Sequence, residues 1–332
     1  MFNIRLNRLA ILSTLTLLWL LTACVAPPAA QTPQEQGAAA TTAPAAEKIT
    51  IKLAANPWSA SALNVNVAKI LLEKIGYPVE ITDIDENAQW AALASGDLHA
   101  SLEVWPSGHQ KNIKDYIDTK QVENGGPLGP VGKIGWYIPT YMLTDHPELA
   151  TWEGFKQPED AKLFATAETG DSGQFLAGDP GWVQYDTDII KNLGLNLKVV
   201  QSGSETAVLS AVDAAYSRKA PILFYFWTPH SVHAKYQLTE VKLPEYTAEC
   251  YAKATEGGVA CDYPADVLFK IFWPSLKEKA PEAYQLLKNM NYTTKDQIDM
   301  MAAVDLKKQT PEEAAKAWVD ANEKVWSAWM PK

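Results

Sequence analysis

Two segments far apart in this chain share one plan: a predicted helix leads into an apolar strand, the strand ends on a tryptophan, and a proline and a histidine follow. They read "LEVWPSGH" (102–109) and "FYFWTPH" (224–230). A helix that leads into a strand through a short connection is the building unit of parallel α/β sheets. The repeated plan therefore predicts two α/β lobes of equivalent design.

The first lobe begins near residue 48. Apolar periodicity predicts strands at 49–56, 79–85 and 99–105, with helices at 61–77 and 87–95 between them. Gly76 and Gly96 stand where the two helices are expected to stop. Strand, helix and strand with short joints imply parallel pairing through right-handed crossovers.

The second lobe is predicted to contain a helix at 178–195, a helix at 203–219 and the strand at 221–227. In the first of these helices, Asp179 suits the N-cap, Pro180 suits the first helical position and Gly194 suits the stop. Trp182 would then lie in the first turn, where free backbone N–H groups and the helix dipole attract anions. The alternative is a capped surface helix whose tryptophan covers a neighbour.

A chain of 332 residues, 47% of them hydrophobic, is long enough for two cores. The segment "GKIGWYIPTYML" (132–143) is the expected first crossing between the lobes, and "GGVACDYP" (257–264) is the expected return. Lobe one is thus predicted to comprise 48–141 plus 264–332, and lobe two 142–263.

The carboxyl ends of the two predicted strands are the expected place for a ligand, because open parallel sheets bind ligands beyond these ends. Trp105 and Trp227 each stand at such an end. Two lobes that face each other would place Trp105 on one lip of a cleft and Trp227 on the other. The alternative for Trp227 is a lid that covers its own sheet.

Residues 1–23 have the plan of an export signal. Two arginines precede an uncharged apolar run at 9–21, which is shorter than the roughly 20 apolar residues of a spanning helix. The run ends in "LTAC" (21–24), which is similar to the lipobox of bacterial lipoproteins and predicts a lipid on Cys24. An ordinary secretory signal with a chance cysteine is the alternative.

The following segment, 24–47, is rich in Ala, Pro, Gln and Thr and has no apolar periodicity. It buries too little apolar surface to offset its ordering entropy, so we expect a tether. Lipid, tether and folded body together predict a protein held at the outer face of a membrane. Without residues 1–23 the chain loses two of its 29 basic and none of its 39 acidic residues, so its net charge becomes −12. This charge argues against nucleic acid as a partner.

The cysteines and histidines of the folded part predict a disulfide and no metal site. Cys250 and Cys261 are an even pair in an exported chain, which is typical of a disulfide. A metal pair is the rival interpretation, but neither a C-x-x-C spacing nor a neighbouring histidine supports it. His230 and His233 form H-x-x-H outside a clear helix and without a nearby carboxylate pair, so zinc is not expected.

Two further features carry no functional assignment. Trp318, Trp326 and Trp329 follow near-helical spacing at the end of the chain, and such a stripe is typical of core packing. Glu103 lies within a predicted strand, and its neighbours do not reveal which way its side chain points.

Three motifs in a fixed order give the chain a specific resemblance. W-x3-H follows one strand (Trp105, His109), D-P-G-W precedes a helix (179–182), and F-W-T-P closes another strand (226–229). "LASGD" and "AKLF" fit as well. Together they resemble the glycine betaine-binding proteins of ABC importers over residues 48–290, and the three tryptophan motifs are the most specific part.

The resemblance implies a two-lobed α/β fold of the periplasmic-binding-protein kind (type II), with two crossovers at a hinge. Carried over position by position, it makes Trp105, Trp182 and Trp227 an aromatic box for a quaternary ammonium group. It assigns the ligand carboxylate to His109 and to the backbone N–H groups of Val183 and Gln184. Some relatives have a cysteine, in a local disulfide, where this chain has Gln184, so the sequence departs from the family at a position that bears on specificity, while backbone recognition can survive the change.

We therefore expect a lipid-anchored, extracytoplasmic solute receptor that acts as a monomer. It would capture a small zwitterion such as glycine betaine, proline betaine or carnitine, and deliver it to a membrane ABC permease. No cofactor and no chemistry on the ligand are expected. The alternatives are an exported enzyme acting on choline-type substrates, for which no G-x-S-x-G or H-E-x-x-H motif is found, and a structural surface lipoprotein.

Overall fold

The computed structural model describes residues 48–332, and every structural statement below refers to this part of the chain. Its strands form one sheet in the order β2-β1-β3-β9-β4-β7-β5-β6, with β8 paired to β4. The strands are β1 (Ile51–Ala55), β2 (Val79–Asp83), β3 (Ala100–Val104), β4 (Glu123–Pro139), β5 (Gly173–Ala177), β6 (Leu197–Gln201), β7 (Phe224–Thr228), β8 (Leu238–Glu240) and β9 (Ala265–Phe272). The predicted export signal (1–23), the predicted tether (24–47) and Cys24 lie outside the described residues.

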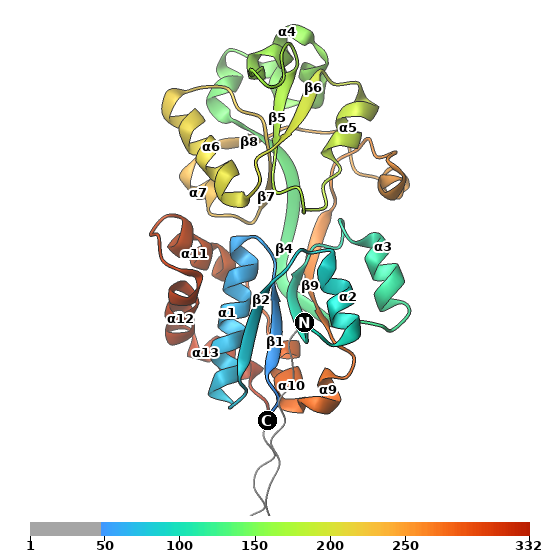
Figure 1. Cartoon of the computed structure of the whole chain (residues 1–332). Helices are drawn as coiled ribbons and strands as arrows, with labels where there is room; N and C mark the ends of the chain where they lie inside the picture. Colours follow the sequence, from blue (N-terminus) through green and yellow to red (C-terminus); the bar gives the residue numbers. More distant parts are fainter. Residues whose placement is uncertain (1–47) are drawn as a thin grey trace, which may run out of the picture. The chain divides into compact units, whose positions relative to one another are not determined.

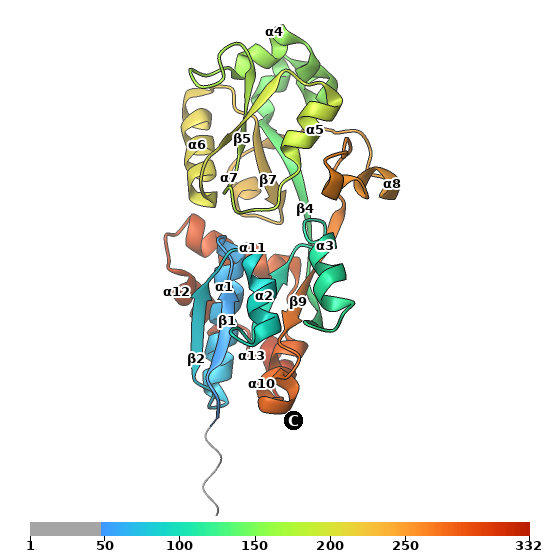
Figure 2. The same ribbon diagram turned by 45° about the vertical axis from the view of Figure 1, so that its right-hand side comes forward.

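Helices cover the strands in two groups, one at each end of the sheet (Figure 1 and Figure 2). The helices are α1 (Ser59–Lys74), α2 (Ala88–Ser95), α3 (Gln110–Asn112), α4 (Pro158–Ala161), α5 (Asp186–Leu193), α6 (Glu205–Arg218), α7 (Val232–Lys235), α8 (Ala248–Tyr251), α9 (Leu276–Lys279), α10 (Pro281–Asn289), α11 (Thr294–Asp305), α12 (Pro311–Ala321) and α13 (Glu323–Trp326). Among residues 48–332, none of these helices has the length and apolar character that crossing a bilayer requires.

The first half of the fold follows the sequence prediction closely. β1 pairs in parallel with β2 and with β3, and α1 and α2 are the connecting helices. Gly96 ends α2 in the left-handed conformation, with φ of 84°, which glycine adopts without steric cost. Leu63, Val67 and Leu71 of α1 are fully buried, as the 3.6-residue period predicts.

The second half repeats the design with β5, β6 and β7, which pair in parallel. α6 precedes β7, and Trp227 stands one residue before the end of that strand. The predicted helix over 178–195 is wrong in its first part, because α5 begins only at Asp186. The Asp179 carboxylate instead accepts the N–H of Gly181 at 2.7 Å, so it closes a local turn, and local turn bonds of this kind compete with helix formation. The end of this helix at Gly194 is confirmed.

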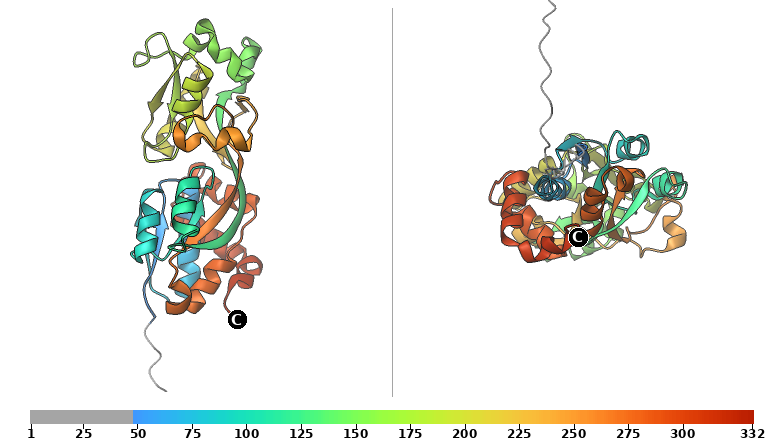
Figure 3. Two further views of the ribbon diagram at one scale, coloured as in Figure 1. Left: turned by 90° about the vertical axis from the view of Figure 1, so that its right-hand side faces the viewer. Right: turned by 90° about the horizontal axis from the view of Figure 1, so that it is seen from below.

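The long strand β4 joins the two halves. It pairs with β9 from Glu123 to Lys133 and with β7 from Lys133 to Tyr137, antiparallel in both cases. In the side view β4 and β9 run next to each other from one half to the other (Figure 3). The two predicted crossings at 132–143 and 257–264 thus coincide with the end of β4 and the approach to β9. The residue limits of the two lobes stay a prediction, because one continuous sheet passes through both halves.

Two smaller predictions are confirmed. Cys250 and Cys261 form a disulfide. Trp318 and Trp329 stack with ring centroids 5.7 Å apart and are buried, and Trp326 is buried close by in the same core. The C-terminal tryptophans are therefore packing residues.

Candidate functional site

Three tryptophans from three separate segments meet between the two halves of the fold. The ring centroids of Trp105 and Trp227 lie 6.4 Å apart, and those of Trp182 and Trp227 lie 5.3 Å apart, both edge to face. All three rings line one pocket and are nearly buried. The sequence prediction that these three residues converge agrees with this geometry.

Two of these rings pack directly against the backbone at glycine residues. A Cβ atom added to Gly132 would lie 2.3 Å from the ring of Trp105, and one added to Gly178 would lie 2.1 Å from the ring of Trp182. Any larger residue at these two positions would collide with an indole. β4 and the 178–185 segment thus form flat walls behind the rings.

Two further aromatic residues complete the pocket, and sequence reasoning missed both. Trp58 follows β1, and its ring centroid is 6.4 Å from that of Trp182. Tyr225 lies in β7 two residues before Trp227, with its ring centroid 6.0 Å from that of Trp182. The sequence did contain a signal for Trp58, because this tryptophan follows a predicted strand by a few residues, and Trp105 likewise stands at the end of one. The rule that ligands bind beyond the carboxyl ends of parallel strands would have placed it at the cleft.

Glu103, whose direction the sequence left open, lies directly behind the pocket. One carboxylate oxygen accepts the indole N–H groups of Trp58 at 2.9 Å and Trp105 at 3.1 Å. The other oxygen accepts side-chain amides of Asn64 at 2.6 Å and Gln297 at 3.0 Å. Glu103 therefore fixes the planes of two pocket rings from inside the core.

Burial raises the pKa of the Glu103 carboxyl to about 7, although the indole N–H groups of Trp58 and Trp105 oppose the shift. Desolvation favours the uncharged acid, while hydrogen bonds from donors favour the carboxylate. Around neutral pH the group behind the rings therefore changes charge.

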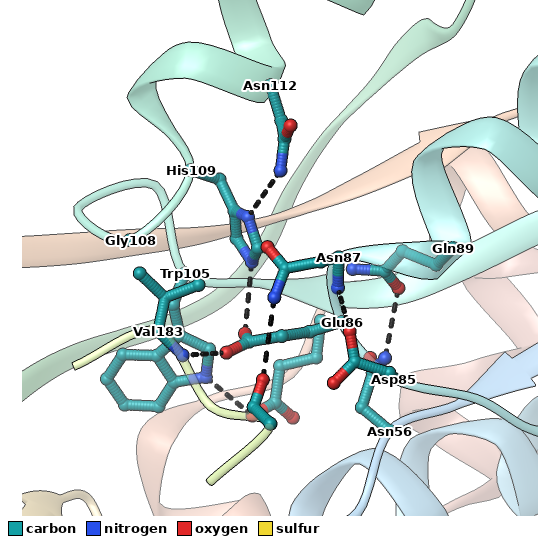
Figure 4. A network of polar contacts seen from close by, with 12 residues as sticks. Asn56, Asp85, Glu86, Asn87, Gln89, Trp105, Gly108, His109, Asn112 and Val183 are labelled. Atoms are coloured by element: carbon teal, nitrogen blue, oxygen red, sulfur yellow. Dashed lines mark hydrogen bonds and ion pairs between the residues drawn. The ribbon is translucent and has the colours of Figure 1, made fainter. Parts of the chain in front are cut away.

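A second carboxylate, Glu86, lies at the polar end of the pocket (Figure 4). Its Oε1 accepts the backbone N–H of Val183 at 2.5 Å, and its Oε2 is 3.0 Å from His109 Nε2. Asn112 Nδ2 lies 3.1 Å from the other ring nitrogen of His109. The sequence prediction placed a ligand carboxylate on these donors of His109 and Val183. In this structure a side chain of the same protein uses them.

The turn that carries Trp105 and His109 is anchored to the returning strand. The Asp266 carboxylate accepts the backbone N–H of Ser107 at 2.9 Å and its hydroxyl at 2.6 Å. Desolvation raises the pKa of Asp266 to about 6, and the bonds from Ser107 oppose the shift. A buried anchor at the start of β9 thus sets the position of two predicted site residues.

The expectation of a helix N-terminus as the anion seat is wrong. Trp182, Val183 and Gln184 lie in the loop before α5, so no helix dipole starts at them. The side-chain amide of Gln184 donates to the carbonyl of Asp179 at 3.0 Å. Val183 nevertheless lines the pocket and donates its backbone N–H to Glu86.

His230 links the two halves away from the pocket. Its Nε2 is 2.7 Å from Glu205 Oε1 in α6 and 3.7 Å from Asp305 Oδ2 at the end of α11. Glu205 also accepts the backbone N–H of Ser59 at 2.7 Å, at the start of α1. His233 makes a different contact: its Nε2 lies 2.9 Å from the backbone carbonyl of Trp227. The H-x-x-H pair therefore serves two separate contacts.

The lining of the pocket suits a compact organic cation. Indole faces attract cations through their quadrupole, more strongly when water is excluded. Among the described residues that line this pocket, none is a lysine or an arginine, and Glu86 is the only carboxylate. Two α/β halves joined by crossing strands, with such a pocket between their strand ends, define a two-lobed solute-binding protein of the periplasmic-binding-protein fold.

Over residues 49–321 the chain matches the family described as the substrate binding domain of ABC-type glycine betaine transport systems (OpuAC). The chain belongs to this family. Its members are extracytoplasmic binding proteins of importers, so the protein is a transport receptor and not an enzyme. The exported-enzyme alternative is thereby excluded.

Individual proteins are similar to this chain in sequence or in fold. The chain is 28% identical over 280 residues to the trimethylamine N-oxide-binding protein of Pelagibacter ubique, which is 81% of this chain and 87% of the relative. Its fold is similar to the lactococcal OpuAC complexed with glycine betaine, with TM-score 0.67, 23% identity and coverage of 86% and 100% of the two chains. It is also similar to the glycine betaine/L-proline-binding protein ProX from Borrelia burgdorferi, with TM-score 0.70, 18% identity and coverage of 85% and 97%.

Proposed function

We propose that this protein captures a compact methylated ammonium compound, the class that contains glycine betaine and choline, in the pocket between its two halves, with Trp105, Trp182 and Trp227 as the aromatic box. The observation that carries the proposal is the meeting of these three rings, which come from the end of β3, from the loop before α5 and from β7. Trp58 and Tyr225 extend the same aromatic surface.

The energetics favour such a ligand. A trimethylammonium group has no N–H to donate, so a single carboxylate holds it poorly, whereas each desolvated indole face contributes about 0.5 to 2 kcal/mol. Three or four such faces together contribute about 1.5 to 8 kcal/mol before the costs of ordering are subtracted. Micromolar binding needs about −8 kcal/mol, so contacts at the polar end of the pocket have to add to the aromatic faces. The other end of the ligand would lie at the polar end of the pocket, beside Glu86 and the Val183 backbone.

Binding is proposed to close the two halves, because the box draws rings from both of them. A ligand that contacts both halves stabilises the closed arrangement by its differential affinity. The closed receptor, a monomer, would then deliver its ligand to an ABC permease in the membrane, which is the partner that the family implies.

The direct test is a calorimetric and thermal-shift panel with glycine betaine, proline betaine, carnitine, choline, trimethylamine N-oxide and unmethylated glycine. We expect at least one methylated compound to bind and to raise the unfolding temperature, since a ligand that binds only the folded state stabilises it by mass action. Glycine lacks the methyl groups that contact indole faces, so it should neither bind nor raise the unfolding temperature. Failure of every methylated compound to bind would remove the proposal.

We further propose that Cys24 carries the lipid that holds the receptor at the outer face of the membrane. Its support is the "LTAC" sequence at 21–24 together with the extracytoplasmic character of the family. In a bacterial host, the full chain should sediment with membranes and incorporate a labelled fatty acid, whereas Cys24→Ser should lose the label. Equal labelling of both forms would show that Cys24 is not the acceptor.

A further inference from the structure

Glu86 occupies the donors that the family resemblance reserves for the ligand. The residue is only 6% exposed and lines the same pocket as the tryptophan box. One oxygen accepts the Val183 N–H and the other contacts His109 Nε2 (Figure 4). A ligand carboxylate at this end would find both donors already engaged.

The position of Glu86 is built into the loop between β2 and α2. Asp85 Oδ1 accepts the backbone N–H of Asn87 at 2.7 Å, which fixes the turn on one side of Glu86. The Asn87 side-chain amide lies 3.4 Å from the carbonyl of Gly181, across the cleft. His109, on the other side, is itself held by Asn112. The carboxylate is therefore supported from both halves of the fold.

Charge at this end of the pocket disfavours a second carboxylate. Two carboxylates that share a site repel each other, and the repulsion is strong where water is excluded. Among the described residues that line the pocket, no lysine or arginine is present to neutralise the pair. A positively charged ligand, by contrast, gains attraction from Glu86 in addition to the indole faces, and a ligand hydroxyl can donate to a carboxylate oxygen.

We infer that Glu86 is a specificity-determining residue that takes the place of the ligand carboxylate. The cleft then selects methylated ammonium cations that lack a carboxylate, with at most a hydroxyl at the polar end, over betaines. This inference rests on the proposed function, since it names the class of ligand that the aromatic box holds.

The test compares affinities for tetramethylammonium, choline and glycine betaine by titration calorimetry in the wild type, Glu86→Gln and Glu86→Ala. We expect the wild type to bind choline at least tenfold more tightly than glycine betaine. In Glu86→Ala this preference should fall at least tenfold, because the negative charge is gone and the donors of Val183 and His109 are free. Glu86→Gln removes the charge but keeps the shape, so it should shift the preference in the same direction by less.

A matched control is Glu80→Gln, a charge change on the exposed face of β2 outside the pocket, which should leave the preference unchanged. Glycine betaine bound more tightly than choline by the wild type, or a preference that Glu86→Ala and Glu86→Gln leave unaltered, would overturn the inference while the proposed function stands. No binding of any of the three probes overturns the inference, and the proposed function falls with it only if the other methylated compounds of the ligand panel also fail to bind. If Glu86→Ala does not fold, as judged by circular dichroism, the shift in Glu86→Gln decides.

Discussion

Replacing Trp227 by leucine is expected to weaken ligand binding about tenfold or more, the scale of one desolvated cation–π face. Trp227 is the central ring of the box, because it contacts both Trp105 and Trp182. Leucine keeps an apolar side chain in the buried position but removes the π face, so the loss reports on cation–π attraction more than on packing.

The measurement is a calorimetric titration of both proteins with the compound that the ligand panel identifies. Trp152→Leu is the matched control, because Trp152 is a partly exposed tryptophan that does not line the pocket, and its affinity should equal that of the wild type. The unfolding temperature without ligand shows that each variant is folded under the titration conditions. An affinity of Trp227→Leu within twofold of the wild type would exclude this ring from the box.

Replacing Glu103 by glutamine is expected to change how the free energy of unfolding depends on pH. The pKa of Glu103 is raised by burial from its ordinary value of 4.5 to about 7 in the folded protein. Between these two values the unfolded chain has lost the proton while the folded chain retains it. The wild type therefore loses stability as the pH rises from about 4.5 to about 7, by a total of about 3 kcal/mol from this group.

Glutamine does not titrate, so the variant lacks this loss. Urea unfolding at a series of pH values should show the stability of the wild type relative to Glu103→Gln falling as the pH rises, and levelling off above pH 7 or so. The other titratable groups are shared by the two proteins and cancel in the difference, apart from Glu205, whose charge interacts with that of Glu103. The exposed Glu80→Gln variant should follow the wild type throughout. A stability difference between wild type and Glu103→Gln that is constant with pH would contradict the buried, proton-retaining state of Glu103.

The Glu103 carboxyl affects both the stability of the fold and the arrangement of the pocket rings. Its hydrogen bonds to Trp58 and Trp105 hold two pocket rings, so the alignment of the box depends on a residue that does not itself line the pocket. Glu86, by contrast, lines the pocket itself and contacts the Val183 backbone and His109. Two acidic side chains thus have different tasks because one lies behind the rings and the other within the cleft.

Local patterns in the sequence determined most of the secondary structure and the general position of the box. The strands that end near Trp105 and Trp227 were predictable, because apolar periodicity and glycine stops depend on nearby residues alone. The rule that ligands bind beyond the carboxyl ends of parallel strands then placed both tryptophans at one cleft. The disulfide between Cys250 and Cys261 followed from the even pair in an exported chain.

The tertiary structure alone decided the start of α5 and the polar end of the pocket. Asp179 and Pro180 have the composition of a helix start, yet the Asp179 carboxylate closes a turn instead, and Val183 directs its N–H to a partner 97 residues away. Glu103 and Glu86 acquire their roles from contacts with residues distant in the chain. Periodicity records which face of an element is buried, whereas the partner of a buried carboxylate is set by how separate elements pack, and that information is not local.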